Sequence, residues 1–148
     1  MQTDRHLTFS DGQAITTTAN STDVISLDGY ALGRGDTNLR IYVQVDEAFA
    51  AAGAATLTVA VVQADNAALT TNAETLFSSG AKALATLVKD GKKFFIEIGV
   101  PKTTKKYLGL TYTVGTGPMT AGKITAGIVD LVPTALDDKI VYWTGRGN

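Results

Sequence analysis

Cysteine is absent from this 148-residue chain, and histidine occurs once, at His6. The absence of cysteine excludes disulfide bonds and thiolate-bound zinc. A serine triad would have to use His6, but no G-x-S-x-G motif is present to supply the nucleophile. The acidic residues do not follow the spacing of a calcium-binding loop. We therefore expect no metal site, no cofactor and no enzymatic activity.

One catalytic possibility stays open, because the paired carboxylates of a glycoside hydrolase come together only in the folded chain. Nothing in the sequence favours one pair over another. The candidates are Asp28, Asp46, Glu47, Glu74, Glu97 and Asp130.

Charged residues are scarce, at 18% of the chain, and the formal net charge is −1. A chain this close to neutral has no overall field that would attract nucleic acid or an anionic membrane. No apolar run approaches the ~20 residues needed to cross a bilayer. The first residues lack the apolar core and cleavage site of a secretory signal. We expect neither nucleic acid nor a membrane as partner, and a protein that acts inside the cell that makes it or on a particle assembled there.

Threonine, alanine and glycine are abundant, and they suit pleated strands and tight turns. Apolar and polar side chains alternate over residues 39–45 and 56–63, which predicts two strands, with Tyr42 on the outward face of the first. Val62 extends the apolar run of the second strand, which indicates partial burial on both faces. About eight short strands at regular spacing, with no βαβ unit, predict an all-β antiparallel sandwich or closed barrel.

The stretch from Lys106 to Leu131 contains two strand patterns around a turn-rich segment, residues 115–122. Pro118 lies in that segment and cannot donate a ladder hydrogen bond, so it belongs to the loop. Two strand patterns on either side of such a segment predict a β-hairpin with a longer loop.

Four other segments have less regular patterns. Residues 1–23 are expected to form an extended N-terminal arm with one or two short strands, and residues 46–55 a loop with one helical turn. Residues 82–88 fit either an isolated helical turn or a strand. Beyond Pro133 the chain is polar until the apolar cluster Ile140–Trp143, which either folds back on its own domain or docks on a neighbouring molecule.

Two short motifs are rejected as functional signals. Residues 117–123 fit the start of a phosphate-binding loop, but Ile124 replaces the required Ser or Thr, and a strand pattern follows instead of a helix. The tripeptide Arg34-Gly35-Asp36 matches an integrin-recognition sequence, but three residues in a glycine-rich turn carry little information.

Three longer phrases carry a family resemblance. They are LTFSDGQAITTTANSTDVISL (residues 7–27), VQVDEAFAAAGAATLTVAVVQADNAAL (43–69) and YLGLTYTVGTGPMTAGKITAGIV (107–129). In this order they resemble the opening, middle and last strand pair of the Bbp16-like capsid cement (decoration) proteins of tailed phages. The resemblance implies a small jelly-roll sandwich, here residues 1–132, followed by a C-terminal arm, residues 133–148.

The same resemblance implies a structural role in a virion. The protein would be made in the bacterial host cytoplasm, bind the outer surface of the major capsid shell, and clamp neighbouring capsomers together. The partners would be the major capsid protein and further copies of this chain, with a dimer favoured over a trimer.

Composition and expected exposure, and not the family, suggest the contact residues. They are Leu7 and Phe9 in the N-terminal arm, Lys102, Lys105 and Lys106 in a basic connection, and Tyr142 and Trp143 in the C-terminal arm. The alternative function is a carbohydrate-binding jelly-roll module on the phage head surface, for which Tyr30, Tyr42 and Tyr112 are the candidate aromatic residues.

Overall fold

The structure, a computed structural model, describes residues 2–27, 39–89 and 95–130, with side chains from Leu7 to Val129. Within these residues it is built from strands and one short 3-10 turn, η1. The elements are β1 (Gln2–Ala14), β2 (Ala19–Asn20), β3 (Ile25–Ser26), β4 (Leu39–Ala50), β5 (Thr56–Ala64), β6 (Glu74–Ser78), β7 (Lys82–Ala83), η1 (Leu84–Thr86), β8 (Ile96–Gly99), β9 (Tyr107–Gly115) and β10 (Ala121–Asp130).

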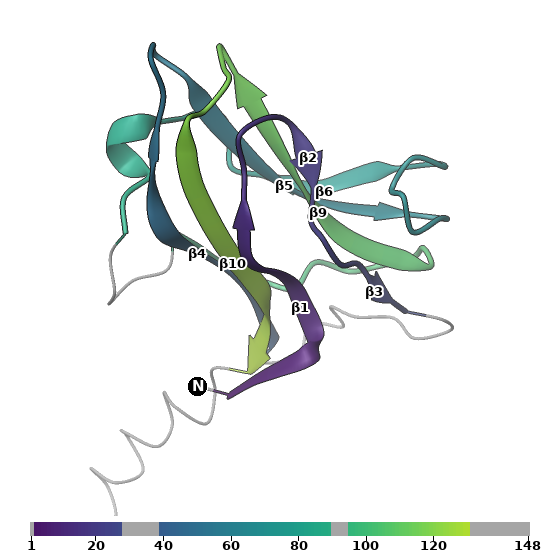
Figure 1. The fold of residues 1–148 in the computed structure, drawn as a ribbon. Helices are drawn as coiled ribbons and strands as arrows, with labels where there is room; N and C mark the ends of the chain where they lie inside the picture. The colour runs from purple at the N-terminus through teal and green to yellow at the C-terminus, as the bar shows by residue number, and fades with distance from the viewer. Residues whose placement is uncertain (1, 28–38, 90–94, 131–148) are drawn as a thin grey trace, which may run out of the picture.

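The strands form two antiparallel sheets packed face to face (Figure 1). The first sheet has the order β1-β10-β4-β8, and the second has the order β2-β9-β5-β6, with β3 paired to β9 and β7 to β5. The chain crosses from one sheet to the other between β1 and β2, β3 and β4, β4 and β5, β7 and β8, β8 and β9, and β9 and β10. This is the arrangement of a double-sheet jelly roll, so the predicted all-β sandwich is confirmed.

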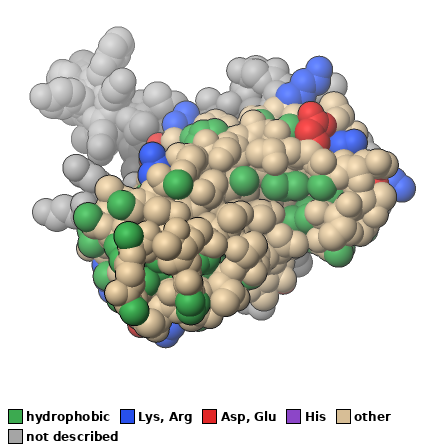
Figure 2. All heavy atoms as spheres, turned by 90° about the horizontal axis from the view of Figure 1, so that it is seen from above, with side chains coloured by type: hydrophobic (Ala, Val, Ile, Leu, Met, Phe, Trp, Pro, Cys, Tyr) green, Lys and Arg blue, Asp and Glu red, His purple; other side chains and the backbone are tan. Residues whose placement is uncertain are grey.

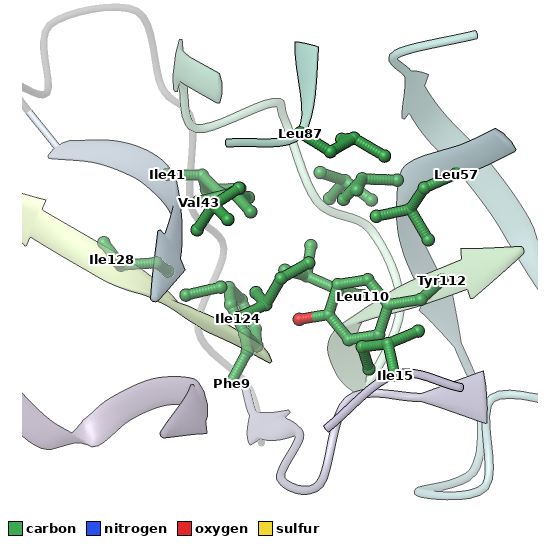
Figure 3. Packing of buried hydrophobic residues seen from close by; sticks show 14 of the residues in the cluster. Phe9, Ile15, Ile41, Val43, Leu57, Leu87, Leu110, Tyr112, Ile124 and Ile128 are labelled. Carbon is green, nitrogen blue, oxygen red and sulfur yellow. The ribbon is translucent and has the colours of Figure 1, made fainter. Parts of the chain in front are cut away.

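The core lies between the two sheets and follows the two-residue period of the strands. Each central strand turns alternate apolar residues inward, as in the series Ile41, Val43 and Val45 of β4. Figure 3 shows Ile124 and Ile128 of the first sheet lying across from Leu110 of the second. The alternation predicted for residues 39–45 and 56–63 is therefore confirmed.

A smaller apolar cluster covers part of the outer face of the second sheet. Val62, Ala64 and Leu69 form it, with Val24 and Tyr107 packed against them. The connection between β5 and β6 brings Leu69 over the sheet, so Val62 is buried although it does not face the main core. The predicted burial of β5 on both faces is confirmed.

The predicted hairpin between residues 106 and 131 is wrong. Strand β9 pairs with β5, β2 and β3 in one sheet, whereas β10 lies between β1 and β4 in the other. The turn-rich segment thus carries the chain from one sheet to the opposite one. A turn-rich segment has the same sequence pattern whether it joins the strands of a hairpin or crosses between two sheets. Pairing with distant strands decides between them, because β9 and β10 are both central strands with partners on each edge.

Two other expectations are corrected, and one open alternative is resolved. Residues 2–14 form one strand, β1, and do not form an arm, because they pair with β10 through several register shifts. Strand β4 continues to Ala50 where a loop was expected, since Phe49 is buried in the core. Residues 82–88 contain both alternatives, with β7 followed by η1.

Tyr42 faces outward from the first sheet but is buried. It lies on the outer face of the first sheet, as expected, yet it is only 3% exposed. Its ring packs against the backbone at Gly127, where an added Cβ would lie 3.3 Å from a ring carbon of Tyr42 and 2.8 Å from the Leu7 carbonyl oxygen. Burial, followed by the nearby carboxylates of Asp11 and Asp46, raises the pKa of the Tyr42 hydroxyl.

Candidate partner-binding surface

The connection between β8 and β9, residues 101–106, carries three lysines and is defined here as the basic loop. Lys102 and Lys106 are exposed, and Lys105 is half-buried. None of the three forms an ion pair with another residue in the described part of the chain. The loop therefore presents positive charge that the rest of the described chain does not neutralise.

A buried glutamine holds this loop in place. Gln63, at the end of β5, is 2% exposed. Its Oε1 accepts hydrogen bonds from the backbone N–H groups of Thr104, at 2.8 Å, and Lys105, at 3.2 Å. Its Nε2 donates to Glu74 Oε2 at 2.9 Å and to Thr104 Oγ1 at 3.2 Å. One side chain thus connects the basic loop to strands β5 and β6.

Backbone hydrogen bonds fix both ends of the basic loop. The Val100 N–H donates to the Leu39 carbonyl at 3.3 Å, and the Leu27 N–H donates to the Lys106 carbonyl at 2.8 Å. Between them Thr103 is 2% exposed, so the middle of the loop is packed inward. A loop held in this way loses little conformational entropy when its lysines engage a partner.

Gln63 could have been found from the sequence. The alternation of β5 places Leu57, Val59 and Val61 inward, and the same register makes Gln63 the next inward residue. A polar side chain at a core-facing position needs hydrogen-bond partners, and these are found in the basic loop.

We expect Gln63→Leu to loosen the basic loop. The leucine has a similar volume but leaves the part-buried N–H groups of Thr104 and Lys105 without their acceptor, which costs about 1 kcal/mol. Amide hydrogen exchange by NMR should then show faster exchange at these two residues. The amides of Leu108 and Leu110 in β9 serve as the control and should be unchanged. Equal acceleration along β9 would indicate global destabilisation, and unchanged exchange at Thr104 and Lys105 would contradict the role given to Gln63.

The opposite end of the sandwich is different in charge. Strand β9 runs from the basic loop to the other end, where four connections meet: residues 15–18, 51–55, 84–88 and 116–120. None of these residues is acidic or basic, and they define the neutral end. Figure 2 looks onto this end and shows uncharged polar and hydrophobic surface over most of it, with charged side chains toward the margins.

Hydrogen bonds join the connections of the neutral end into one surface. The Met119 N–H donates to the Thr16 carbonyl at 2.8 Å, and the Thr120 N–H donates to the Ala50 carbonyl at 2.7 Å. Val88, at 50% the one exposed large hydrophobic residue in the described part of the chain, follows η1 there. Within the described residues, the sandwich thus has lysines without an ion-pair partner at one end and uncharged connections at the other.

The predicted contact residues do not all lie on one surface. Phe9 is 0% exposed and belongs to the main core, so its selection as a contact was wrong: its side chain fills the space between the sheets. Leu7 is half-buried and packs against the same core. Tyr142 and Trp143 lie outside the described residues.

The residues considered for other functions can also be placed. Tyr112 is fully buried and Tyr42 nearly so, which removes both as sugar-stacking candidates, and Tyr30 lies outside the described residues. The segment after the turn that resembles a phosphate-binding loop is strand β10, as its pattern predicted.

Among the candidate carboxylates, those whose side chains are described have individual partners. Asp46 accepts a short hydrogen bond from Thr125 Oγ1, Glu47 lies 3.9 Å from Lys123 Nζ, and Glu97 lies 3.7 Å from Arg40. Within the described residues, no group of three or more His, Cys, Asp or Glu side chains is arranged to hold a metal ion. No helix in that part of the chain is long and apolar enough to cross a bilayer.

The chain matches a known protein family. A family model described as Bbp16 matches residues 9–128, which span the sandwich from β1 to β10. No curated protein is similar enough in sequence to count as a match. The C-terminal cluster Ile140–Trp143 lies outside the matched region.

Proposed function

Because the chain belongs to the Bbp16 family, we propose that it is a capsid cement protein of a tailed phage. It is made in the bacterial host cytoplasm and binds the outer surface of the major capsid shell, where it clamps neighbouring capsomers. Support comes from the resemblance of residues 7–27, 43–69 and 107–129 to such proteins and from the jelly-roll topology. The observation that carries the proposal is the basic loop, which is anchored by hydrogen bonds and whose lysines form no ion pair with the rest of the described chain.

The proposed contact is electrostatic. The basic loop meets an acidic area on the shell, and the anchoring by Gln63 keeps Lys102, Lys105 and Lys106 in a fixed arrangement. A single exposed ion pair contributes only about 0–1 kcal/mol, so one loop gives a weak contact. A homo-oligomer, with a dimer favoured, carries several basic loops that bind the shell at the same time. Its avidity is much higher than the affinity of one loop. A ligand that binds only the assembled shell stabilises that shell.

The test is addition of the purified protein to expanded, empty phage heads, with the melting temperature of the heads as the readout. We expect the wild-type protein to bind and to raise the melting temperature. Lys102→Glu combined with Lys106→Glu should weaken binding about 10- to 100-fold, because two attractive contacts become repulsive. The affinity of the wild-type protein should also fall as salt is added.

The control is Lys82→Glu combined with Lys89→Glu. This variant has the same net charge as the first but changes two lysines beside the neutral end. It should bind the heads with nearly wild-type affinity. If both variants lose affinity equally, the basic loop is not the contact. If saturating wild-type protein leaves the melting temperature of the heads unchanged, the proposed function is wrong.

A further inference from the structure

Strand β8 is an incompletely covered edge of the first sheet. It has four residues and pairs with β4, which has twelve. Within the described residues, no strand lies on the other side of β8. Ile96 and Ile98 turn toward the core from this edge but are only half-buried. An open apolar edge of this kind accepts a further strand.

Part of the β8 backbone has no partner strand within the described residues. In an antiparallel ladder, alternate residues direct their N–H and C=O groups to the same neighbour. Val100 donates to Leu39, so Ile98 and Ile96 also face β4. Glu97 and Gly99 therefore direct their backbone groups away from β4, toward the open edge.

The chain itself supplies a suitable strand. Ile140-Val141-Tyr142-Trp143 consists of β-branched and aromatic residues, which favour strands. The last described strand, β10, ends at Asp130, and nine residues separate it from Ile140. Nine residues span up to about 30 Å. A strand added beyond β8 would lie three strand spacings from β10, or about 14 Å, so the segment can reach it.

Strand direction also favours this edge. Strand β10 is antiparallel to β4, and β4 is antiparallel to β8, so β10 and β8 run the same way. A chain that turns back after β10 is then antiparallel to β8. At the opposite edge it would be parallel to β1, and there the Phe9 carbonyl already accepts a hydrogen bond from the Asp23 N–H, at 2.9 Å.

We infer that residues 140–143 add to the open edge of β8 in the same molecule, as an antiparallel fifth strand of the first sheet. Two of the four side chains then face inward and cover Ile96 and Ile98, which are half-buried without them. The short tether favours this arrangement over pairing with another copy, because it gives the segment a high effective concentration. The sequence allows this segment either to fold back on its own domain or to dock on a neighbouring molecule. The open edge of β8 favours folding back.

Trp143 makes the inference testable, because it is the one tryptophan in the chain. In the full-length protein without phage heads, its fluorescence should be blue-shifted and protected from acrylamide relative to the urea-unfolded chain. Both properties should be independent of protein concentration. Gly99→Pro removes an N–H at the open edge, and proline is tolerated on edge strands. This variant should shift the emission to the red and make the tryptophan several-fold easier to quench.

Gly99→Ala is the matched control, because it keeps the N–H and an added Cβ would meet nothing within 4 Å. It should behave as the wild type. Amide hydrogen exchange of Glu97 and Gly99 in the wild type gives a measurement that needs no variant, and both amides should be protected. The inference is overturned if Trp143 is as quenchable as in the unfolded chain or if its protection rises with concentration, which would indicate pairing between copies. It is equally overturned if folded Gly99→Pro keeps the protection, or if the two amides exchange freely.

Discussion

Replacing Gly122 with alanine is expected to lower the free energy of unfolding by about 3–4 kcal/mol, from backbone strain and overpacking together. Gly122 is the second residue of β10 and has a φ of +138°, a conformation that L-residues rarely adopt. A Cβ at this position would lie 2.3 Å from a ring carbon of Phe49, which is buried in the core. Neither the backbone nor the ring can move without disturbing the sandwich. Urea unfolding followed by circular dichroism measures the change.

Gly53→Ala provides the control for this variant. Gly53 lies in the exposed connection after β4, and an added Cβ would meet nothing within 4 Å. Its unfolding free energy should stay within about 0.5 kcal/mol of the wild type. The two causes at Gly122 can be separated in a Phe49→Ala background, where the clash is absent and only the cost of the backbone conformation remains. A Gly122→Ala protein as stable as the wild type would show that the close packing against Phe49 is not as described.

Tyr112→Ala is expected to cost about 3–5 kcal/mol, as for other large aromatic residues removed from a core. Tyr112 is fully buried between the sheets and is the largest side chain of the core. Its hydroxyl lies 2.7 Å from Ser10 Oγ. Since Ser10 donates its own hydrogen to Gln13 Oε1, Tyr112 is the donor in this pair. The bond joins β9 of one sheet to β1 of the other. Burial raises the pKa of Tyr112 well above its usual value, so the donor remains protonated.

Tyr112→Phe separates packing from hydrogen bonding. The ring volume is kept and only the hydroxyl is lost, and Ser10 retains its bond to Gln13. The expected cost is about 1 kcal/mol. Both variants can be compared by urea unfolding at neutral pH. If phenylalanine were as damaging as alanine, the hydrogen bond between the sheets would outweigh the packing of the ring, contrary to the expectation.

The sequence predicted the strands better than their pairing. Alternation is a local property, so the inward faces of β4 and β5 could be assigned from residues two apart. The partner of β9 could not, because the turn around Pro118 suits a hairpin as well as a crossing between sheets. The selection of Phe9 failed for a related reason. Its neighbours are polar, and the register shifts of β1 that carry it into the core are set by pairing with β10.

The basic loop was visible in the sequence as a group of lysines, but its rigidity was not. The residue that anchors it, Gln63, lies about forty positions earlier in the chain. Its inward register was readable, whereas its partners depend on how β8 and β9 meet the end of β5. The neutral end is a property of the fold in the same way, because its four connections are far apart in sequence and become neighbours only in the jelly roll.

The central place of β10 in the first sheet has a consequence for biosynthesis. Strands β1 and β4 do not pair with each other, and each finds its partner in β10, the last described strand to leave the ribosome. The nascent chain therefore leaves β1 without a strand partner in its sheet, and β4 with no partner but β8, until nearly all of it has been translated. Such long-range closure makes folding slow and leaves the intermediates prone to aggregate. Slower elongation or bound chaperones should matter most during synthesis of the first 120 or so residues, before the strand that completes the sheet becomes available.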